Sequence, residues 1–487
     1  MVPMRRTCRL IACVTWLVGL ASAAPAQEAR PNILLITVDD LAWDSLGVTG
    51  SHVRDVSPNV DRLAREGVRF TRAHVTVAIC QPSRNVLMTG RYPQNTGALG
   101  FEDIKPEVPT LVEALARAGY YTGLMAKTGH VVPSRAAAWR EIVKARELKN
   151  GRSAELYLAR TRAFLAKARD AGQPFFLMLN SQDPHRPYAG SQQEEAFKAR
   201  DAASEDAQYG GGFPDVEHAY APSEVTVPPS LPDLPAVRKE LAQYYTSARR
   251  ADETTGAVLR ALDEAGLRDR TLVIWLSDNG AALPFAKANV WLNSTRTPLI
   301  VRWPNVVKPA TVDDRHLVGG IDLAPTILEA AGLPALPGTE GRSFVPLLRG
   351  QRQSGREYVF TQIDQVNSGV SYPMRAVTGL RYGYIFNAWS DGKTRMQIES
   401  MIGLTFPAMQ EAAPGNPDIA ARVRHFLFRT KEELYDYASD PYALRNLIDD
   451  GRHQAVVKTY RELLLRHMKE SADPQLGAFE HFIADKR

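Results

Sequence analysis

Two apolar stretches of the sequence end in pairs of possible oxygen ligands. "NILLITV" is followed by Asp39 and Asp40, and "TLVIWLS" is followed by Asp278 and Asn279. Carboxylate and amide oxygens bind hard cations such as Ca²⁺ and Mg²⁺, whereas zinc prefers nitrogen and sulfur ligands. A single Asp after a strand is more often a turn residue or a helix cap. The four residues together predict a divalent-cation site if the two strand ends meet.

Other polar groups follow strands or begin helices in the same way. "NSQDPH" places Asp183 and His185 after a third apolar run. Taken one at a time, a Lys is usually a solvated surface charge, and a His is more often structural than catalytic. A divalent cation and several basic groups around one pocket would hold an anion such as sulfate or phosphate. The candidate basic groups are Arg84, Lys127, His130 and Lys287.

The N-terminus has the pattern of a secretory signal peptide over residues 1–26. Three arginines precede a short apolar run, which ends in the small residues "ASAAPA". The run is short of the ~20 residues of a membrane span, and no later segment is long and apolar enough to be one. Cleavage would remove the three arginines and lower the formal charge from +5 to +2, so the charge indicates no nucleic-acid partner. We expect a secreted protein, in a bacterial periplasm.

Cys80 would be the only cysteine of the mature chain, because Cys8 and Cys13 leave with the signal. An unpaired thiol in a secreted protein indicates intermolecular pairing or a reactive group, although a buried apolar cysteine is a common alternative. "SRNVLMTG" after it can begin a helix, whose free N–H groups and positive dipole end favour an anion. Arg84, one turn on, could bind the same anion through two bonds.

Strand and helix patterns alternate along residues 27–350. This alternation predicts an α/β domain with a mostly parallel central sheet flanked by helices, whose ligands bind at the carboxyl ends of the strands. Residues 351–487 read instead as a smaller α+β domain, with short aromatic strands in an antiparallel sheet and a helix over 455–470. We expect this second domain to contribute to the substrate pocket.

"CQPSR" (80–84), the following "LMTGRYPQNTG", "NILLITVDD" and "SDNG" together resemble the type I, formylglycine-dependent sulfatases, over most of the mature chain. The resemblance implies an alkaline-phosphatase-like fold and bound Ca²⁺ rather than Mg²⁺. It also implies that a formylglycine-generating enzyme oxidises Cys80 to formylglycine. "SQDPHRPY", "SYPMR" (371–375) and "ELYDYASDPYALRNL" are similar to the N-sulfoglucosamine sulfohydrolase (heparan sulfamidase) branch. The expected substrate is therefore the N-sulfate of glucosamine in heparan sulfate or heparin fragments.

The resemblance also implies a role for each candidate residue. Sugar contacts would come from Asp183 and Arg375, the base that expels sulfate would be His130, and the acid that protonates the leaving group would be His185. The groups that hold sulfate and formylglycine would be Arg84, Lys127 and Lys287. The Ca²⁺ ligands would be Asp39, Asp40, Asp278 and Asn279.

Three other functions stay open at this point. The first is an O-sulfatase that acts on a sulfated sugar or an aryl sulfate. The second is a phosphatase of the same superfamily, although such enzymes use Thr or Ser and two zinc ions, and here the nucleophile position is Cys80. The third is a glycan-binding pseudoenzyme that keeps its thiol. The sequence also leaves open whether the chain forms a homodimer.

Overall fold

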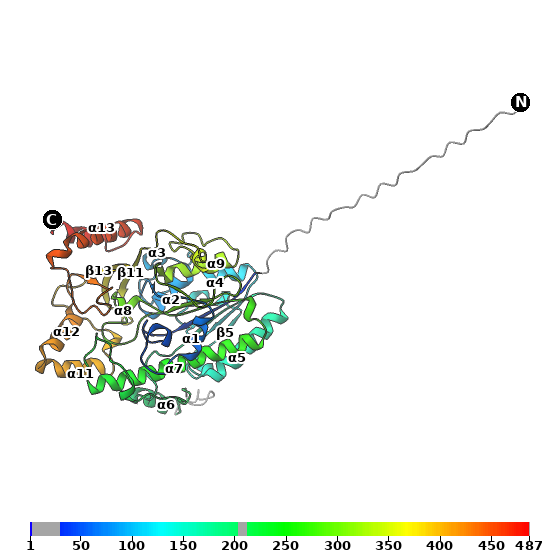
Figure 1. Cartoon of the computed structure of the whole chain (residues 1–487), viewed down its shortest axis with the longest axis horizontal. Helices are drawn as coiled ribbons and strands as arrows, with labels where there is room; N and C mark the ends of the chain where they lie inside the picture. The colour runs from blue at the N-terminus through cyan, green and yellow to red at the C-terminus, as the bar shows by residue number, and fades with distance from the viewer. Residues whose placement is uncertain (2–29, 203–211, 487) are drawn as a thin grey trace.

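The computed structural model describes residue 1 and residues 30–202 and 212–486. Residues 2–29, which hold nearly all of the predicted signal peptide, lie outside this description. Figure 1 shows a broad body with the sheets inside and long helices along its edges. In the described parts of the chain, no helix combines the length and the apolarity that a membrane span needs.

A central sheet of eight strands forms the main body. Its order is β5-β4-β6-β1-β7-β8-β2-β9. The first five strands in this order are parallel, whereas β8 is antiparallel to both of its neighbours. The strands are β1 (Asn32–Val38), β2 (Val68–Phe70), β4 (Tyr121–Met125), β5 (Glu141–Val143), β6 (Phe175–Ser181), β7 (Thr271–Ser277), β8 (Leu299–Arg302) and β9 (Thr311–Asp313). This confirms the predicted mostly parallel sheet.

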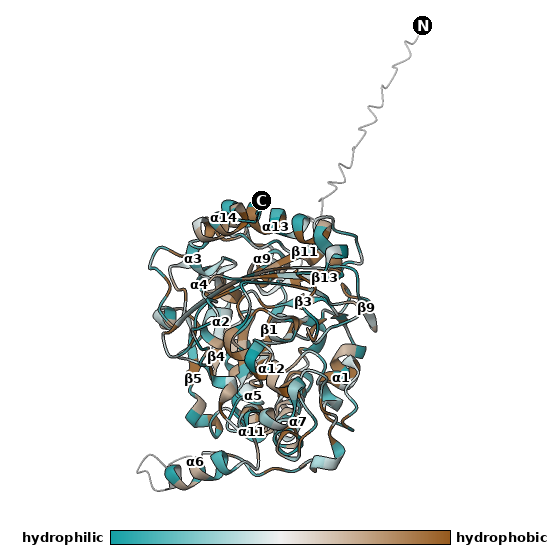
Figure 2. Ribbon diagram, turned by 90° about the vertical axis from the view of Figure 1, so that its left-hand side faces the viewer, coloured by the Kyte–Doolittle hydropathy of each residue, from teal (hydrophilic) through white to brown (hydrophobic). Residues whose placement is uncertain are grey.

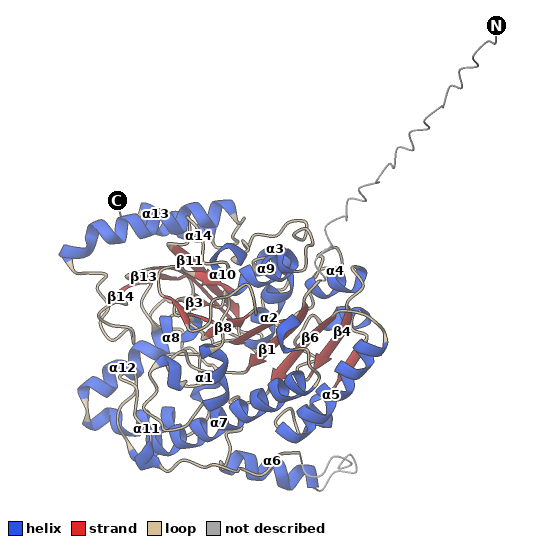
Figure 3. Cartoon of the chain, turned by 45° about the vertical axis from the view of Figure 1, so that its right-hand side comes forward, coloured by secondary structure: helices blue, strands red, loops and turns tan. Residues whose placement is uncertain are grey.

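The central strand β1 is apolar throughout because both of its faces are covered. Leu34 and Ile36 belong to the apolar cluster that includes residues of α5 and α7, whereas Ile33 and Leu35 belong to the cluster with α4 and α9. Figure 3 shows these helix groups on opposite sides of the sheet. The helices of the main body are α1 (Pro58–Arg65), α2 (Cys80–Thr89), α3 (Pro93–Thr96), α4 (Leu111–Arg117), α5 (Ala154–Asp170), α6 (Gln192–Ala202), α7 (Pro235–Glu264), α8 (Leu292–Thr295), α9 (Leu323–Ala330) and α10 (Val345–Leu348).

The register of the central strands decides where the polar groups meet. Val38, the last residue of β1, pairs with Ser181 of β6 on one side and with Ser277 of β7 on the other. The three strands therefore end at the same level, because their directions are parallel. The residues that follow them emerge at one edge of the sheet, where ligands bind in open α/β folds.

A second, antiparallel sheet follows residue 350. Its strands, in sheet order, are β11 (Tyr358–Gln365), β12 (Ser371–Gly379), β13 (Tyr382–Asn387) and β14 (Glu432–Asp436). One face packs on α13 (Gln454–Glu470) and α14 (Leu476–Ala484), and the other joins the main apolar cluster. Figure 2 shows the labelled strands β11 and β13 beneath α13 and α14. The remaining helices are α11 (Thr405–Ala412) and α12 (Pro417–Phe428). The predicted sheet and packed helix are confirmed, and the domain boundary near residue 350 stays a prediction.

Two very short strands, β3 (Ala73–His74) and β10 (Val318–Gly319), pair with each other beside the main sheet.

Helix α2 ends at a glycine. Gly90 has a φ of 66° and so adopts the left-handed conformation that stops a helix.

Candidate active site

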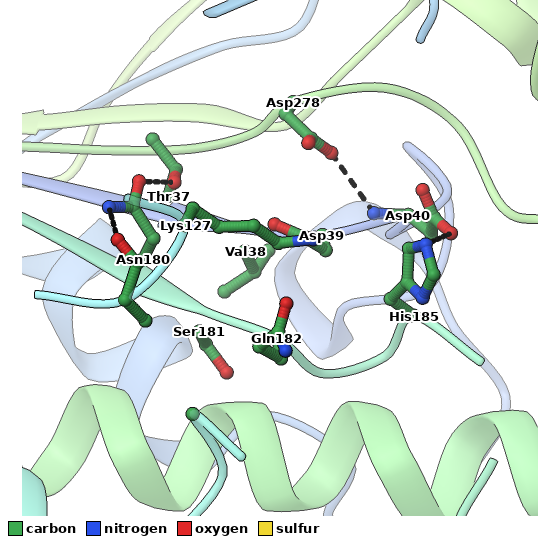
Figure 4. A network of polar contacts seen from close by, with 12 residues as sticks. Thr37, Val38, Asp39, Asp40, Lys127, Asn180, Ser181, Gln182, His185 and Asp278 are labelled. Carbon is green, nitrogen blue, oxygen red and sulfur yellow. Dashed lines mark hydrogen bonds and ion pairs between the residues drawn. The ribbon is translucent and has the colours of Figure 1, made fainter. Parts of the chain in front are cut away.

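The four predicted metal ligands meet at the carboxyl edge of the central sheet. Asp39, Asp40, Asp278 and Asn279 are all fully buried. The backbone N–H of Asp40 donates to Asp278 Oδ1 at 3.1 Å, and Asn279 Nδ2 donates to Asp40 Oδ1 at 2.7 Å. Figure 4 shows Asp40 between Asp278 and His185. The sequence left open whether the two strand ends meet, and the structure shows that they do, whereas the metal-ligand role of these residues stays a prediction.

The chemistry of this cluster fits a hard cation. Burial raises the pKa of Asp278 to about 7, and the charge of Asp39 acts in the same direction. A positive charge between these carboxylates would relieve both effects. Asn279 Oδ1 is buried and has no hydrogen-bond partner among the described residues. Because a buried acceptor without a partner is rare and costly, this oxygen is a ready ligand for Ca²⁺ or Mg²⁺.

Cys80 begins helix α2 next to these acids. Its Sγ and one oxygen each of Asp39 and Asp278 all lie within 4.8 Å of one another. The side chain is a free thiol and is only 4% exposed. Burial raises the pKa of Cys80 to about 12, so the thiol stays protonated at neutral pH. Because the thiolate is the reactive form of cysteine, the unmodified side chain is poorly suited to act as a nucleophile here.

Arg84 lies one turn along α2 and is fully buried. Its Nη2 lies 2.5 Å from Asp39 Oδ1 and 3.1 Å from Asp278 Oδ2. Its Nη1 donates to Thr37 Oγ1 at 2.8 Å and to Asn180 Oδ1 at 2.5 Å. The guanidinium thus bridges two of the predicted metal ligands. Thr37 and Asn180 fix its plane, and the sequence analysis missed both because a Thr and an Asn inside strands carry no signal.

Lys127 and His130 lie on the turn after β4. Lys127 Nζ forms an ion pair with Asp39, and the N–H of His130 donates to the carbonyl of Lys127 at 2.8 Å. The turn therefore folds His130 back toward Lys127. Burial lowers the pKa of His130 to about 3, with the charge of Lys127 as the next cause. Its Nδ1 is buried, and none of the described residues forms a hydrogen bond with it.

Lys287 and His185 meet on the other side of Asp40. Lys287 Nζ lies 2.9 Å from Asp40 Oδ2, and His185 Nε2 lies 3.9 Å from the same oxygen. Burial lowers the pKa of His185 to about 3, and the charges of Lys287 and Lys127 add to this effect. His185 Nδ1 is 2.6 Å from the carbonyl of Arg186, which fixes the ring.

Glu399 belongs to the same group, and the sequence analysis missed it. One carboxylate oxygen lies 2.9 Å from Lys287 Nζ and the other lies 3.3 Å from His185 Nε2. Glu399 begins a short 3-10 turn (Glu399–Met401) that lies between β13 and α11. No motif or periodic pattern marks this turn, so only the fold reveals its place in the site.

Asp183 does not face the site, contrary to the expected sugar contact. It is fully buried, and its two oxygens bind Arg152 Nε at 3.0 Å and Arg250 Nε at 2.6 Å. Arg152 Nη2 also donates to the carbonyl of His185 at 3.0 Å. Asp183 therefore supports the loop of His185 from within the protein.

The position of Arg375 also differs from the expected sugar contact. This residue is 2% exposed, and its guanidinium contacts Asp364 at 2.7 Å and Asp473 at 2.5 Å. Its Nη1 donates to the carbonyls of Ile363 and Met374. All three nitrogens are used by the second sheet and by Asp473 in the segment between α13 and α14, so none of them is directed at a substrate.

Comparison with known proteins agrees with this geometry. The profile of the family "Sulfatase" matches residues 31–333, and that of "N-sulphoglucosamine sulphohydrolase, C-terminal" matches residues 282–386. N-sulphoglucosamine sulphohydrolase of Homo sapiens is 30% identical over 99% of this chain and 97% of its own length. An ulvan-active sulfatase of Formosa agariphila is 27% identical over 91% of this chain and 76% of its own length.

A solved structure supports the fold. A protein in complex with its substrate D-glucosamine-2-N,6-O-disulfate superposes with a TM-score of 0.67, at 17% identity, over 91% of this chain and 99% of that one. The predicted alkaline-phosphatase-like architecture is thereby confirmed. Since the family match spans more than half of the chain and the human relative aligns over nearly all of it, the chain belongs to the sulfatase family, whose members hydrolyse sulfate esters or sulfamates.

Proposed function

We propose that this chain removes the N-sulfate of glucosamine from heparan sulfate or heparin fragments. The observation that carries the proposal is the near full-length similarity to human N-sulphoglucosamine sulphohydrolase. The family match over residues 282–386 supports it, because this stretch contains "SYPMR", one of the motifs that indicated the same branch. A secretory signal over residues 1–26 is consistent with a substrate outside the cytoplasm, and we expect the periplasm as the location.

The site residues would divide the reaction between them. Oxidation of Cys80 to formylglycine would supply, as its hydrate, a geminal-diol oxygen that attacks sulfur, and Ca²⁺ would stabilise the charge that develops. Asp39, Asp40, Asp278 and Asn279 would hold the cation. Ion pairs with these acids hold Arg84, Lys127 and Lys287, which would bind the sulfate oxygens beside them.

The two histidines would move protons in separate steps. His185 would protonate the leaving nitrogen, since an amine leaves poorly without a proton. His130 would take a proton from the second diol hydroxyl, so that the aldehyde re-forms and sulfate leaves the enzyme. Their different neighbours support this division, because His130 lies beside Lys127 whereas His185 lies beside Asp40 and Glu399.

The test is sulfate release by protein co-produced with a formylglycine-generating enzyme, with Ca²⁺ present. N-sulfoglucosamine and 6-O-sulfated N-acetylglucosamine are offered separately, and Cys80→Ala is the matched inactive control. We expect release from the N-sulfated sugar and none from the control. Release from the O-sulfated sugar alone would overturn the proposed substrate and leave the sulfatase chemistry intact.

An O-sulfatase is the second candidate. Its support is the similarity to the ulvan-active sulfatase of Formosa agariphila, which covers 91% of this chain. The same experiment separates the two candidates, because each predicts release from only one of the two sugars.

A further inference from the structure

Glu399 is the one acid of the active-site cluster that does not follow a strand of the central sheet. It reaches Lys287 at 2.9 Å and His185 at 3.3 Å from a turn that lies between the second sheet's β13 and helix α11. Its side chain is 17% exposed, so it lies at the wall of the site rather than in the core. Its two oxygens contact two different residues, so both partners depend on where this turn lies.

The turn is fixed on both sides. Before it, the hydroxyl of Tyr372 accepts the N–H of Gln397 at 3.1 Å and lies 3.3 Å from the carbonyl of Arg395. After it, Glu240 of α7 accepts the N–H of Thr405 at 2.7 Å. Tyr372 is the buried tyrosine of "SYPMR", so this motif contributes to the site through a backbone contact rather than through its arginine.

The same glutamate of α7 ties the turn to the loop of His185. Glu240 Oε1 lies 2.5 Å from Arg186 Nη1, and Arg186 is the residue next to His185 in the chain. Glu240 and Arg186 are both buried. His185 and Glu399 are therefore held against one another through a network of buried contacts outside the site.

Asp40, His185 and Glu399 could in principle hold a cation of their own, because one ligand atom of each lies within 4.8 Å of the others. Lys287 argues against this function. Its Nζ lies 2.9 Å from both Asp40 Oδ2 and Glu399 Oε2, so an ammonium already lies between the two carboxylates. The remaining Glu399 oxygen is directed at His185 Nε2, the nitrogen that would face a leaving group.

We propose that Glu399 is a positioning residue, which orients His185 Nε2 and Lys287 Nζ and so couples the C-terminal part of the chain to protonation of the leaving group. The inference rests on the proposed acid role of His185. Loss of Glu399 would leave the ring held only by the carbonyl of Arg186 and the neighbouring Asp40. The effect should depend on the leaving group, because an activated aryl sulfate needs little help from an acid.

The experiment compares Glu399→Gln and Glu399→Asp with His185→Ala, the double variant Glu399→Gln/His185→Ala and the wild type. Each protein is assayed on N-sulfoglucosamine and on 4-nitrocatechol sulfate. Glu411→Gln is the matched control, because Glu411 is exposed on the adjacent helix α11. Melting temperatures are measured for every variant, so that a folding defect is recognised.

General acid–base groups typically contribute about 10²–10⁴-fold, so we expect His185→Ala to lose at least about 100-fold on the sulfamate and much less on the aryl sulfate. Glu399→Gln should lose at least about tenfold more on the sulfamate than on the aryl sulfate, because both substrates use Lys287 but only the sulfamate depends strongly on the acid, and Glu399→Asp should recover part of the loss. The double variant should be within about threefold of His185→Ala, because two residues that act as one unit are not additive. Glu411→Gln should match the wild type.

Equal losses of Glu399→Gln on both substrates, or full additivity with His185→Ala, would overturn the inference while the proposed function stands. Equal losses of His185→Ala itself on both substrates would instead remove the acid role, and the inference with it. If the wild type hydrolyses only the O-sulfated sugar, that sugar replaces N-sulfoglucosamine as the poor leaving group, and the comparison keeps its meaning.

Discussion

Arg375 Nε lies 2.5 Å from Asp473 Oδ2, and both side chains are almost completely buried. This pair joins strand β12 to the segment between α13 and α14. Asp364 of the neighbouring strand β11 binds the same guanidinium. One arginine therefore pairs with two buried acids and holds the second sheet against its helices.

Replacing Arg375 should affect stability rather than substrate choice. Arg375→Ala would leave two buried carboxylates without their basic partner, which typically costs about 3–5 kcal/mol. We expect a lower urea midpoint and, at temperatures where the variant is folded, an unchanged ratio of kcat/KM for N-sulfoglucosamine and an aryl sulfate. Arg352→Ala, at an exposed position, is the control. A rise of KM for the sugar at unchanged stability would instead support a direct contact between Arg375 and the sugar.

Local sequence patterns were enough to identify the residues of the site that follow strands or lie in a contiguous motif. Strand ends marked Asp39 and Asp278, and a contiguous motif marked Cys80 and Arg84, so the residues closest to the expected chemistry were found. Whether the groups meet depends on the register of β1, β6 and β7, which only the fold shows.

The errors have a different cause. Asp183 and Arg375 look like free charges in the sequence, and only the fold shows that each is neutralised inside the protein. Glu399 could not be predicted, because its contact with Lys287 joins positions 112 residues apart and it does not directly follow a strand or a motif. Burial and long-range pairing decide the roles of these three residues, and a local sequence pattern predicts neither.

Removal of the metal should lower both activity and stability. A ligand that binds only the folded state contributes about 2.7 kcal/mol at a concentration 100 times its Kd. EDTA should therefore lower the melting temperature and the rate, and Ca²⁺ should restore both better than Mg²⁺. Asn279→Ala should raise the Ca²⁺ concentration needed for recovery, because it removes the unpartnered oxygen. The exposed Gln351 supplies the control, as Gln351→Ala. Recovery with zinc alone would contradict the oxygen-ligand site.

A substitution at Gly403 would show whether the turn of Glu399 must pack closely against Glu240 and Arg186. The φ of Gly403 is +125°, and an added Cβ would overlap the carboxylate of Glu240 and the guanidinium of Arg186. Gly403→Ala should therefore displace the turn and lower activity on N-sulfoglucosamine by at least about tenfold, as expected for the loss of a general acid. Gly415→Ala is the matched control, because a Cβ there meets no atom within 4 Å. Full activity of Gly403→Ala would show that the turn tolerates displacement.

His467 should make the protein less stable in acid. Its ring stacks on Phe360 with centroids 3.9 Å apart, and burial lowers the pKa of His467 to about 4 from a usual 6.5. The unfolded chain then binds a proton between these two values and the folded chain does not, so unfolding becomes easier as the pH falls from 6.5 to about 4. Above pH 6.5 the contribution of His467 to stability is fully present.

The replacement His467→Phe keeps an aromatic ring on Phe360 and removes the titration. We expect the free energy of unfolding, measured in urea, to fall less steeply in the variant between pH 6.5 and 4, by on the order of 1–3 kcal/mol over the range. The exposed His52 supplies the control, and His52→Gln should leave the slope unchanged. An equally steep loss of stability in His467→Phe would mean that other groups cause the acid sensitivity, since only the titration of residue 467 differs between the two proteins.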